Sequence, residues 1–581
     1  MLVSLQLEDG GSAGWSQTWR RIEGILEEVT SSSMTVSLEK MEGWVVDGLV
    51  GRRSPGVKIV KRSEEKLYTN SSKQLRKLLN YELSDKHLPA RIILESVLGP
   101  GTESSPSPSP SPQILTIFNK KLLSDESKMT ALQLCSLCLP LTLLHGPPGT
   151  GKTTTLAAAV LSAVKNGEKV LVVAPSHAAC DAVTLAITEH SDWVRLTRLG
   201  SKLRLTSTAV ERFLPDQLRP SPSLERLGQR LGWVRRQLLD GHRGRGELLE
   251  EEARLVAQQR REYREHEEQL MKEAEVVVCT LQTSFRASIL RMVRQDFDLV
   301  CVDEAGFSLD SQVLPVVAGA RRLILAGDHL QLPPVVLSEE ARARGLAQSL
   351  FERLLSSKYL EESVAVLKVQ YRSNKIISDW SSGQFYQSLL RADPGNAEIS
   401  LEQIVSRTAL ARYSEEAWLL TRPLLWLDTK GKDWEEDVED EESISNIGEA
   451  VMVANIVAVL TNLGLDQRDI GVISPYWAQV GLVRTLLWET DRMTGVEVRT
   501  VDGYQGREKE TVILSLVRSN TEAEVGFLSE SRRINVSVTR AKRCCIIIGD
   551  SSTLRSDSCL ESLWDYCYQR EAVISVDKIN L

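Results

Sequence analysis

The sequence predicts an α/β protein in which two parallel-sheet domains follow one another along the chain. Between about 119 and 207, apolar runs such as "KVLVVAP" alternate with helical segments such as "HAACDAVTLAITEH", and the runs resume after 275 with "EVVVCTL", "FDLVCVDEA" and "RRLILAGD". This alternation is typical of a parallel sheet covered by helices. A second series begins at about 361 with "AVLKVQY" and includes "DIGVISP", "ETVILSLV" and "RCCIIIGD". We therefore expect a first α/β domain over 119–360 and a second over 361–581.

Residues 1–62 have a different pattern, because apolar and polar positions alternate in "RIEGILEEV", "MTVSLEK", "GWVVDGLV" and "GVKIV". Such alternation between turn residues predicts short antiparallel strands and hence a small barrel or sandwich. Within 63–118, two helical segments follow, "SSKQLRKLLNYEL" and "ARIILESVL". The Ser-Pro pairs of "ESSPSPSPSPQ" then predict an extended linker.

A helical insertion is predicted at 208–275, inside the first α/β domain. Its first half spaces apolar residues three and four positions apart, as one face of a helix requires. These residues are Leu224, Leu227, Leu231, Val234 and Leu238. After "GHRGRG", the charged run "ELLEEEARLVAQQRREYREHEEQLMKEAE" is expected to return as a second helix and complete a hairpin.

The net charge of −8 does not exclude a polyanionic partner. The run "DWEEDVEDEE" at 433–442 holds eight carboxylates and no base, so the rest of the chain is neutral, and we expect this run to be a solvated surface loop. The nine cysteines are scattered, and "CSLC" at 135–138 has no second pair at a zinc-binding distance, so buried helix positions are favoured. No secretory signal or membrane-length apolar run is visible. We expect a cytoplasmic or nuclear protein without a membrane partner.

The stretch "LLHGPPGTGKTTTL" has the spacing of a phosphate-binding loop, with an apolar strand before it and a helix after it. Its glycines let successive backbone N–H groups point at one anion, and the helix N-terminus adds its dipole. We expect Lys152 to reach the β- and γ-phosphates of ATP and the Thr153 hydroxyl to bind Mg²⁺. The expected nucleotide contacts are Gly146, Pro147, Pro148, Gly149, Thr150, Gly151, Lys152, Thr153 and Thr154.

Residues suited to hydrolysis follow other predicted strands. In "DLVCVDEA", Asp303 suits the coordination shell of Mg²⁺ and Glu304 can activate the attacking water. Gln331 in "LAGDHLQLPP" could sense the γ-phosphate. Arg372 in "VQYRSN" and Arg540 in "NVSVTRAKR" could stabilise charge on the transferred phosphoryl group. Closure of the two domains would complete this site, and hydrolysis would reopen it.

The motifs "GPPGTGKTTT", "APSHAACD", "DEAGFSLD", "LAGDHLQLPP", "VQYRSN", "SPYWAQV", "TVDGYQGREKE" and "RRINVSVTRAK" occur in an order that resembles superfamily 1B helicases. The sequence is most similar to the up-frameshift-like branch and, within it, to the immunoglobulin mu-binding protein 2 type. This resemblance spans about 20–570. It implies two tandem RecA-like P-loop domains, an N-terminal β-barrel on a helical stalk, and a hairpin insertion in the first RecA-like domain. By this analogy the hairpin is a clamp over nucleic acid, the alternative being a coiled-coil partner site.

The resemblance also implies roles outside the phosphate loop. Tyr371 would stack on adenine, and Glu508 would contact the ribose or the γ-phosphate region. A single nucleic-acid strand would cross both domains, on contacts from Ser176, His177, Thr280, Ser474, Pro475, Thr500 and Asp502. Trp477 could stack on a base, although packing on its own domain is the favoured interpretation. One departure is Lys128, which stands where the family has an adenine-recognising glutamine, and lysine offers hydrogen-bond donors only.

Together these features predict an ATP- and Mg²⁺-dependent helicase that moves 5′ to 3′ along single-stranded DNA or RNA. Its ATPase activity would be stimulated by nucleic acid, and we expect it to act as a monomer. The alternative is a nucleic-acid-binding remodelling ATPase that displaces bound proteins with weak or no unwinding. A strand-displacement assay beside an ATPase assay separates these two hypotheses.

Overall fold

The structure is a computed structural model of the 581-residue chain. It describes residues 2–8, 19–29, 34–38, 57–61, 72–73, 76, 89–93, 113–200, 222–239, 245–336, 338–405, 418–440, 443–491 and 493–579. The predicted Ser-Pro linker, most of the two helices expected in 63–118 and the expected strand "GWVVDGLV" lie outside these residues. Contacts divide the chain into a first unit of Met1–Ala90, Ala163–Val300 and Leu314–Arg321, and a second unit of Arg91–Ser162, Cys301–Val313 and Arg322–Leu581.

The N-terminal strands form one antiparallel sheet in the order β3-β2-β1-β4. The strands are β1 (Leu2–Glu8), β2 (Trp19–Val29), β3 (Met34–Leu38) and β4 (Val57–Lys61). Strand β1 pairs with β2 on one side and with β4 on the other. Antiparallel strands at these positions are as predicted, and their closure into a barrel stays a prediction.

A parallel sheet of strand order β11-β5-β10-β9-β6-β8-β7 carries the glycine-rich loop. Its strands are β5 (Leu141–His145), β6 (Val170–Ala174), β7 (Leu196–Arg198), β8 (Val276–Thr280), β9 (Leu299–Val302), β10 (Leu323–Gly327) and β11 (Val364–Val366). Every residue of β5, β6, β8, β9 and β10 is buried. Strands buried on both faces have continuous apolar sequences, which explains why the sequence pattern predicted them.

The sequence pattern assigned the strand within "AVLKVQY" to the second domain, and this assignment is wrong. In "AVLKVQY", β11 pairs in parallel with β5, with Val364 opposite Leu143, so the first sheet extends to Val366. The next residues form the short strand β12 (Val369–Gln370), which pairs with β13 (Arg391–Ala392) in a separate two-stranded sheet. An apolar run of this length specifies a buried strand, but its partner strand depends on tertiary contacts.

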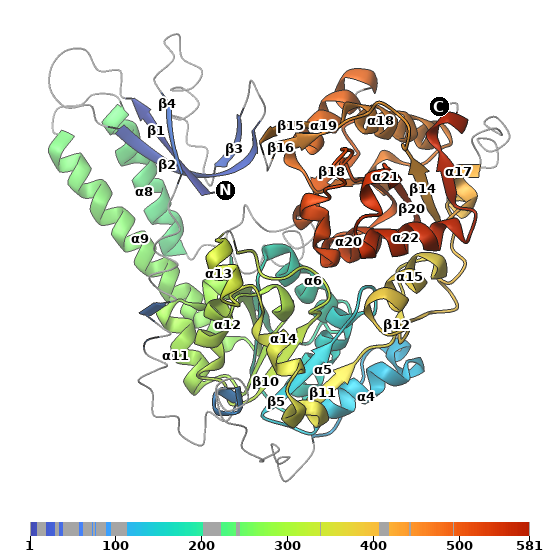
Figure 1. Cartoon of the computed structure of the whole chain (residues 1–581). Coiled ribbons are helices and arrows are strands. Elements are labelled where there is room, and N and C mark those ends of the chain that lie inside the picture. Colours follow the sequence, from blue (N-terminus) through green and yellow to red (C-terminus); the bar gives the residue numbers. More distant parts are fainter. Residues whose placement is uncertain are drawn as a thin grey trace. The chain divides into compact units, whose positions relative to one another are not determined.

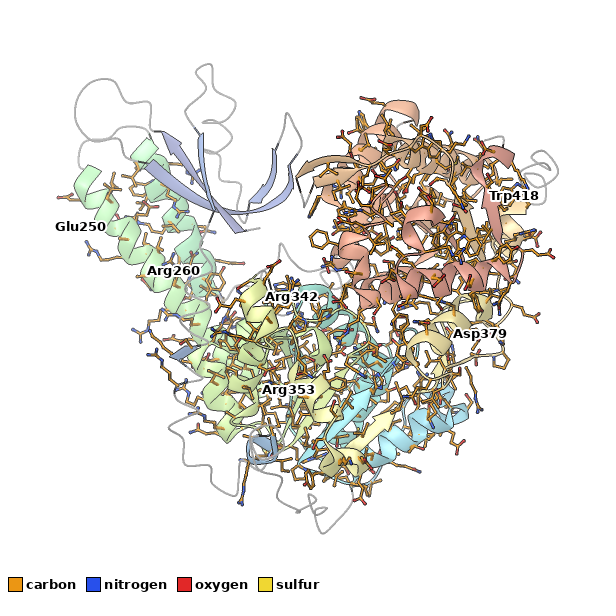
Figure 2. All side chains as sticks on the ribbon, in the orientation of Figure 1. Glu250, Arg260, Arg342, Arg353, Asp379 and Trp418 are labelled. Carbon is orange, nitrogen blue, oxygen red and sulfur yellow. The ribbon has the colours of Figure 1, made fainter. Side chains whose placement is uncertain are left out.

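Two long helices lie in the part of the first unit where the helical insertion is predicted, and their connection into a hairpin stays a prediction. Helices α8 (Pro222–Leu239) and α9 (Arg245–Glu273) run side by side (Figure 1). The predicted leucine-rich face of α8 is confirmed, because all five of its apolar residues are buried. Ion pairs join the two helices at Arg230–Glu251 and Arg235–Glu252, each with an N–O distance of 2.7 Å. The rest of α9 is strongly charged, and Figure 2 shows its exposed residues Glu250 and Arg260.

A second parallel sheet lies in the second unit, in the order β18-β17-β19-β20-β14-β21. Its strands are β14 (Leu424–Asp428), β17 (Ile470–Ser474), β18 (Glu497–Thr500), β19 (Lys509–Ser515), β20 (Ala541–Gly549) and β21 (Val573–Ser575). Helices α18 (Ile447–Asn462) and α19 (Trp477–Asp491) cover one face, and α20 (Ser531–Val538) and α22 (Ser558–Tyr568) cover the other (Figure 1).

Part of the acidic run is ordered, contrary to the expected loop. Strand β15 (Asp437–Asp440) pairs with β16 (Ser443–Ser445). Trp434 anchors the beginning of the run, because its ring lies where a side chain on Gly448 would otherwise stand. Of the "CSLC" cysteines, Cys135 is buried in α4 (Glu126–Ser136), whereas Cys138 lies beyond the end of that helix. None of the helices in the described ranges is long and apolar enough to cross a membrane.

A buried carboxyl group stands at the start of α18. Glu449 has no exposed surface, and one of its oxygens accepts hydrogen bonds from the Ser515 hydroxyl at 2.7 Å and the Val517 N–H at 2.9 Å. Burial raises the pKa of Glu449 to about 8, although these two hydrogen bonds oppose the shift. The folded protein therefore retains a proton at a pH where the unfolded chain has released it.

We expect the free energy of unfolding to fall as pH rises from about 5 to about 8, by on the order of a few kcal/mol from this group alone. Glu449→Gln keeps the shape and cannot ionise, so it should flatten this dependence. Urea unfolding at several pH values measures both proteins, and the exposed control Glu489→Gln should behave like the wild type. The same pH slope in Glu449→Gln as in the wild type would contradict the assignment.

Candidate active site

The glycine-rich loop connects β5 to α5 (Lys152–Lys165) and belongs to the second unit. Gly149 and Gly151 have φ angles of 71° and 75°, a region that side chains disfavour. A Cβ on Gly146 would lie 2.5 Å from the Cβ of Lys152, so only glycine lets the loop close over the helix. The Thr150 hydroxyl donates to the Pro147 carbonyl at 2.8 Å and braces the curl from within. Pro148 completes the loop, and Thr154 lies in the first turn of α5.

Two carboxylates from the end of β9 meet the lysine of this loop. The Lys152 ammonium lies 2.8 Å from a Glu304 oxygen and 3.4 Å from an Asp303 oxygen. Burial alone would lower the pKa of Lys152, but the carboxylates of Glu304 and Asp303 outweigh it and raise that pKa. Glu304 has a φ of 53°, which is rare for a residue with a side chain. Backbone strain of this kind persists where the surrounding structure holds it, and it is concentrated at functional sites.

The residues predicted to bind Mg²⁺ also lie together. The Thr153 hydroxyl donates to the second Asp303 oxygen at 3.1 Å. A hydroxyl and a carboxylate are the hard oxygen ligands that Mg²⁺ prefers, usually together with water and substrate phosphates. This pair therefore fits a magnesium ion next to the phosphate loop.

The arginines predicted to act in hydrolysis approach the loop from the second half of the chain. Arg540 is 2% exposed, and its guanidinium donates to the Gln331 side-chain oxygen at 2.9 Å. Burial and the neighbouring charge of Arg372 lower the pKa of Arg540. The backbone on either side of Arg372 lies against the loop, since the Tyr371 N–H donates to the Gly149 carbonyl at 2.8 Å. The Arg372 side chain donates to Glu508 at 2.6 Å.

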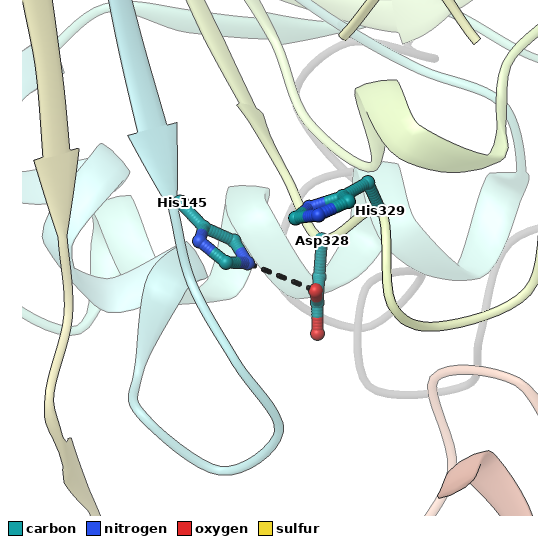
Figure 3. Close-up of side chains that lie close together, drawn as sticks. All are labelled: His145, Asp328 and His329. Atoms are coloured by element: carbon teal, nitrogen blue, oxygen red, sulfur yellow. Dashed lines mark hydrogen bonds and ion pairs between the residues drawn. The ribbon is translucent and has the colours of Figure 1, made fainter. Parts of the chain in front are cut away.

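Asp328 accepts a hydrogen bond from His145, the last residue of the phosphate-loop strand (Figure 3), and another from Gln331. Asp328, His145 and His329 have ligand atoms within 4.8 Å of one another, as a metal site would require. However, both Asp328 oxygens already accept two hydrogen bonds each. One accepts from His145 and the Leu330 N–H, and the other from Gln331 and Tyr386. These bonds hold the pKa of Asp328 at about 2 against the effect of burial. We therefore interpret Asp328 as a hydrogen-bond centre, with the His329 ring packed beside that of His145 at a centroid distance of 5.0 Å.

Three residues that take part in this centre were not predicted from the sequence. His145 is the last residue of β5, Tyr386 follows α15 (Lys375–Phe385), and Asn535 lies in α20. The Tyr386 hydroxyl donates to Asp328 at 2.7 Å and accepts from the Asn535 amide at 3.0 Å. The same amide donates to the Leu330 carbonyl at 2.8 Å. The position of His145, one residue before the glycine loop, was a usable signal, whereas a lone tyrosine after a helix carries none.

Comparison with known proteins identifies the family. An AAA domain family matches residues 123–226 and 228–339, and a second one matches 346–552. DNA-binding protein SMUBP-2 of Mesocricetus auratus is 34% identical over 94% of this chain and 53% of its own length. DNA polymerase alpha-associated DNA helicase A of Schizosaccharomyces pombe is 33% identical over 79% of this chain and 68% of its own length. For the regulator of nonsense transcripts 1 homolog of Neurospora crassa, the values are 33%, 74% and 37%.

The chain belongs to the up-frameshift-like branch of the superfamily 1 helicases. Its two parallel sheets are the tandem RecA-like domains of that family. The chain spans about half the length of the SMUBP-2 relatives that it matches.

In the first unit of this helicase-family chain, two predicted nucleic-acid contacts follow neighbouring strands. Ser176, just beyond the end of β6, caps α6 (His177–Thr188), and Thr280 ends β8 and caps the short α10 (Leu281–Ser284). The third predicted contact, His177, already has a partner, because its ring nitrogen Nδ1 lies 3.2 Å from the guanidinium of Arg198. Arg198 itself is buried and pairs with Asp181 at 3.1 Å, since a buried guanidinium requires a partner.

In the second unit, the other predicted contacts gather at the ends of β17 and β18. Ser474 and Thr500 are register partners on these parallel strands, Pro475 follows Ser474, and Asp502 lies 3.6 Å from Arg533. The favoured interpretation, that Trp477 packs on its own domain, is wrong. Its side chain begins α19 and is 67% exposed, which leaves the indole open to a stacking partner.

Removal of the Tyr386 hydroxyl tests the hydrogen-bond centre. Tyr386→Phe leaves Asp328 and Asn535 each without one buried partner, so the free energy of unfolding should fall by about 1–3 kcal/mol. Denaturant unfolding measures this, and Tyr568→Phe, at a residue that is 63% exposed, is the matched control. Equal stability of the two variants would show that the hydroxyl contributes nothing to the centre.

Proposed function

We propose that this protein is a nucleic-acid-stimulated ATPase that moves 5′ to 3′ along single-stranded DNA or RNA and separates paired strands. The observation that carries the proposal is the contact between Arg540, which precedes the second-sheet strand β20, and Gln331, which follows the first-sheet strand β10. An arginine and a polar sensor joined beside a phosphate loop can respond together to the γ-phosphate. Family membership supports the same activity.

In this proposal Lys152 changes partners when the nucleotide binds. In this structure the Lys152 ammonium lies 2.8 Å from Glu304. The β- and γ-phosphates of a bound nucleotide attract the ammonium away from that carboxylate. Glu304 is then free to accept a proton from the attacking water. Gln331 and Arg540 remain beside the γ-phosphate, and Arg540 together with Arg372 stabilises the charge that develops there.

Thr153 and Asp303 would hold Mg²⁺, and their 3.1 Å separation supports this assignment. When bound, the ion neutralises charge on the β- and γ-phosphate oxygens. Asp303 must be ionised for this role. Burial raises the pKa of Asp303, and the nearby Lys152 ammonium opposes that shift, as a bound Mg²⁺ would.

The same proposal assigns nucleic-acid contacts within each unit. Ser176 and Thr280 in the first unit, and Ser474 and Thr500 in the second, carry hydroxyls at or just beyond the carboxyl ends of parallel strands, and those of Thr280 and Ser474 are buried. Hydroxyl groups are common donors to backbone phosphates, which fits a strand gripped without regard to sequence. Trp477 adds an exposed indole on which a base can stack. The N-terminal sheet is proposed as the family's β-barrel, and α8 with α9 as its helical insertion.

The decisive experiment combines ATPase and strand-displacement assays. ATP hydrolysis should rise on addition of single-stranded DNA or RNA, and a duplex with a 5′ overhang should be unwound. Glu304→Gln should lower kcat by about 100-fold or more, whereas Glu339→Gln, at an exposed residue, should not. Stimulated hydrolysis with protein displacement but no strand separation would favour the remodelling ATPase, and no hydrolysis by the wild type would end both proposals.

Arg540 tests the coupling between the two sheets. Arg540→Ala should lower kcat by about 1,000-fold, the scale of an arginine that stabilises phosphoryl-transfer charge, while nucleotide affinity stays within a few fold. Stopped-flow binding of a fluorescent ATP analogue separates the two effects. Arg570→Ala, at an exposed residue of the same sign, is the control. Loss of nucleotide binding with the kcat effect would assign Arg540 to ground-state binding.

A further inference from the structure

An aromatic ring stands beside the phosphate loop. The Tyr371 N–H donates to the Gly149 carbonyl at 2.8 Å, which ties this residue to the loop, and its side chain is only half-buried. The tyrosine hydroxyl is fixed by donation to Asp125 at 2.9 Å. A rigidly held, partly open aromatic face next to a phosphate site is a surface on which the base of the nucleotide can stack.

A single ammonium group touches both the ring and the loop. Lys128 is 5% exposed, and its Nζ lies 3.7 Å from the centroid of the Tyr371 ring. The same atom lies 3.2 Å from the position that a Cβ on Gly151 would occupy. The ammonium lies over the Tyr371 ring, so a base that enters this space while its phosphates lie in the loop meets Lys128.

Lys128 forms an ion pair with Asp125. The 3.6 Å between the ammonium and the carboxylate oxygen is longer than a hydrogen bond, so the N–H groups of Lys128 can turn to a ligand. The Asp125 oxygens already accept from the Ser127 N–H and hydroxyl, the Lys128 N–H and the Tyr371 hydroxyl. An ammonium has three donors and no acceptor. The edge of the base that faces Lys128 is therefore read by donors alone.

We propose that Lys128 makes this enzyme prefer nucleoside triphosphates whose purine carries an oxygen at position 6, as guanine and hypoxanthine do, over those with adenine. The proposal rests on the proposed nucleotide hydrolysis and names its substrate class. A 6-oxopurine presents O6 and N7, two adjacent acceptors that one lysine can contact together. Adenine presents N7 beside an amino group. The hydrogens of this amino group point at the ammonium, so two hydrogen-bond donors face each other and no bond forms between them.

ITP and ATP form a matched pair for the test, because oxygen replaces the amino group at position 6. With nucleic acid present, the wild-type kcat/KM for ITP should exceed that for ATP. In Lys128→Gln, an amide that can both donate and accept, the ratio of ITP to ATP should fall by about tenfold. The control Lys120→Gln, at an exposed residue of the same charge, should keep the wild-type ratio.

The wild-type ratio needs no variant, so misfolding of Lys128→Gln cannot hide the answer. A wild-type preference for ATP, or the same ratio in wild type and Lys128→Gln, would overturn the proposal. Absence of hydrolysis with both nucleotides would reject the proposed function instead. In that case, competition of ITP and ATP against a fluorescent nucleotide measures base preference by binding alone, and tighter binding of ATP would reject the role of Lys128.

Discussion

The hydrogen bond between the Arg540 guanidinium and the Gln331 amide is the constraint on which the catalytic arrangement depends. A guanidinium that is 2% exposed cannot be satisfied by bulk water, so it must find acceptors in the protein. These acceptors are the Val536 carbonyl in the preceding helix α20, the Arg507 carbonyl and Gln331. Gln331 follows β10 of the first sheet, and Arg540 precedes β20 of the second sheet. Their hydrogen bond therefore couples the loop after β10 to the segment between α20 and β20.

Asp328 extends this constraint to the phosphate loop. Its carboxylate accepts from Gln331, from Tyr386 beside α15 and from His145 at the end of β5. Asp328 is buried and accepts four hydrogen bonds, so it is left partly unsatisfied, at a cost in free energy, if any of the four donors shifts. A change at the γ-phosphate can therefore reach the helices of the second sheet through Gln331, Asp328 and Tyr386.

The Lys152 pair shows how a charged loop is stabilised before substrate arrives. Asp303 and Glu304 balance the buried ammonium, whose charge would otherwise be costly in this environment. The left-handed backbone at Glu304 aims its carboxylate at the lysine. Glu304 therefore has a strained backbone and also compensates the charge of Lys152. Phosphates that pair with Lys152 in its place would free the Glu304 carboxylate to accept a proton from water.

The sequence by itself determined the strands, the glycine loop, the leucine face of α8 and most of the residues that gather at the loop. These features are local, since apolar periodicity reports burial and glycine spacing reports backbone conformation. Tertiary structure alone decided that β11 joins the first sheet, that Arg198 is buried against Asp181, and that Tyr386 and Asn535 complete the Asp328 centre. The sequence pattern shows that a polar or apolar group needs a partner, but only the folded chain selects that partner from distant segments.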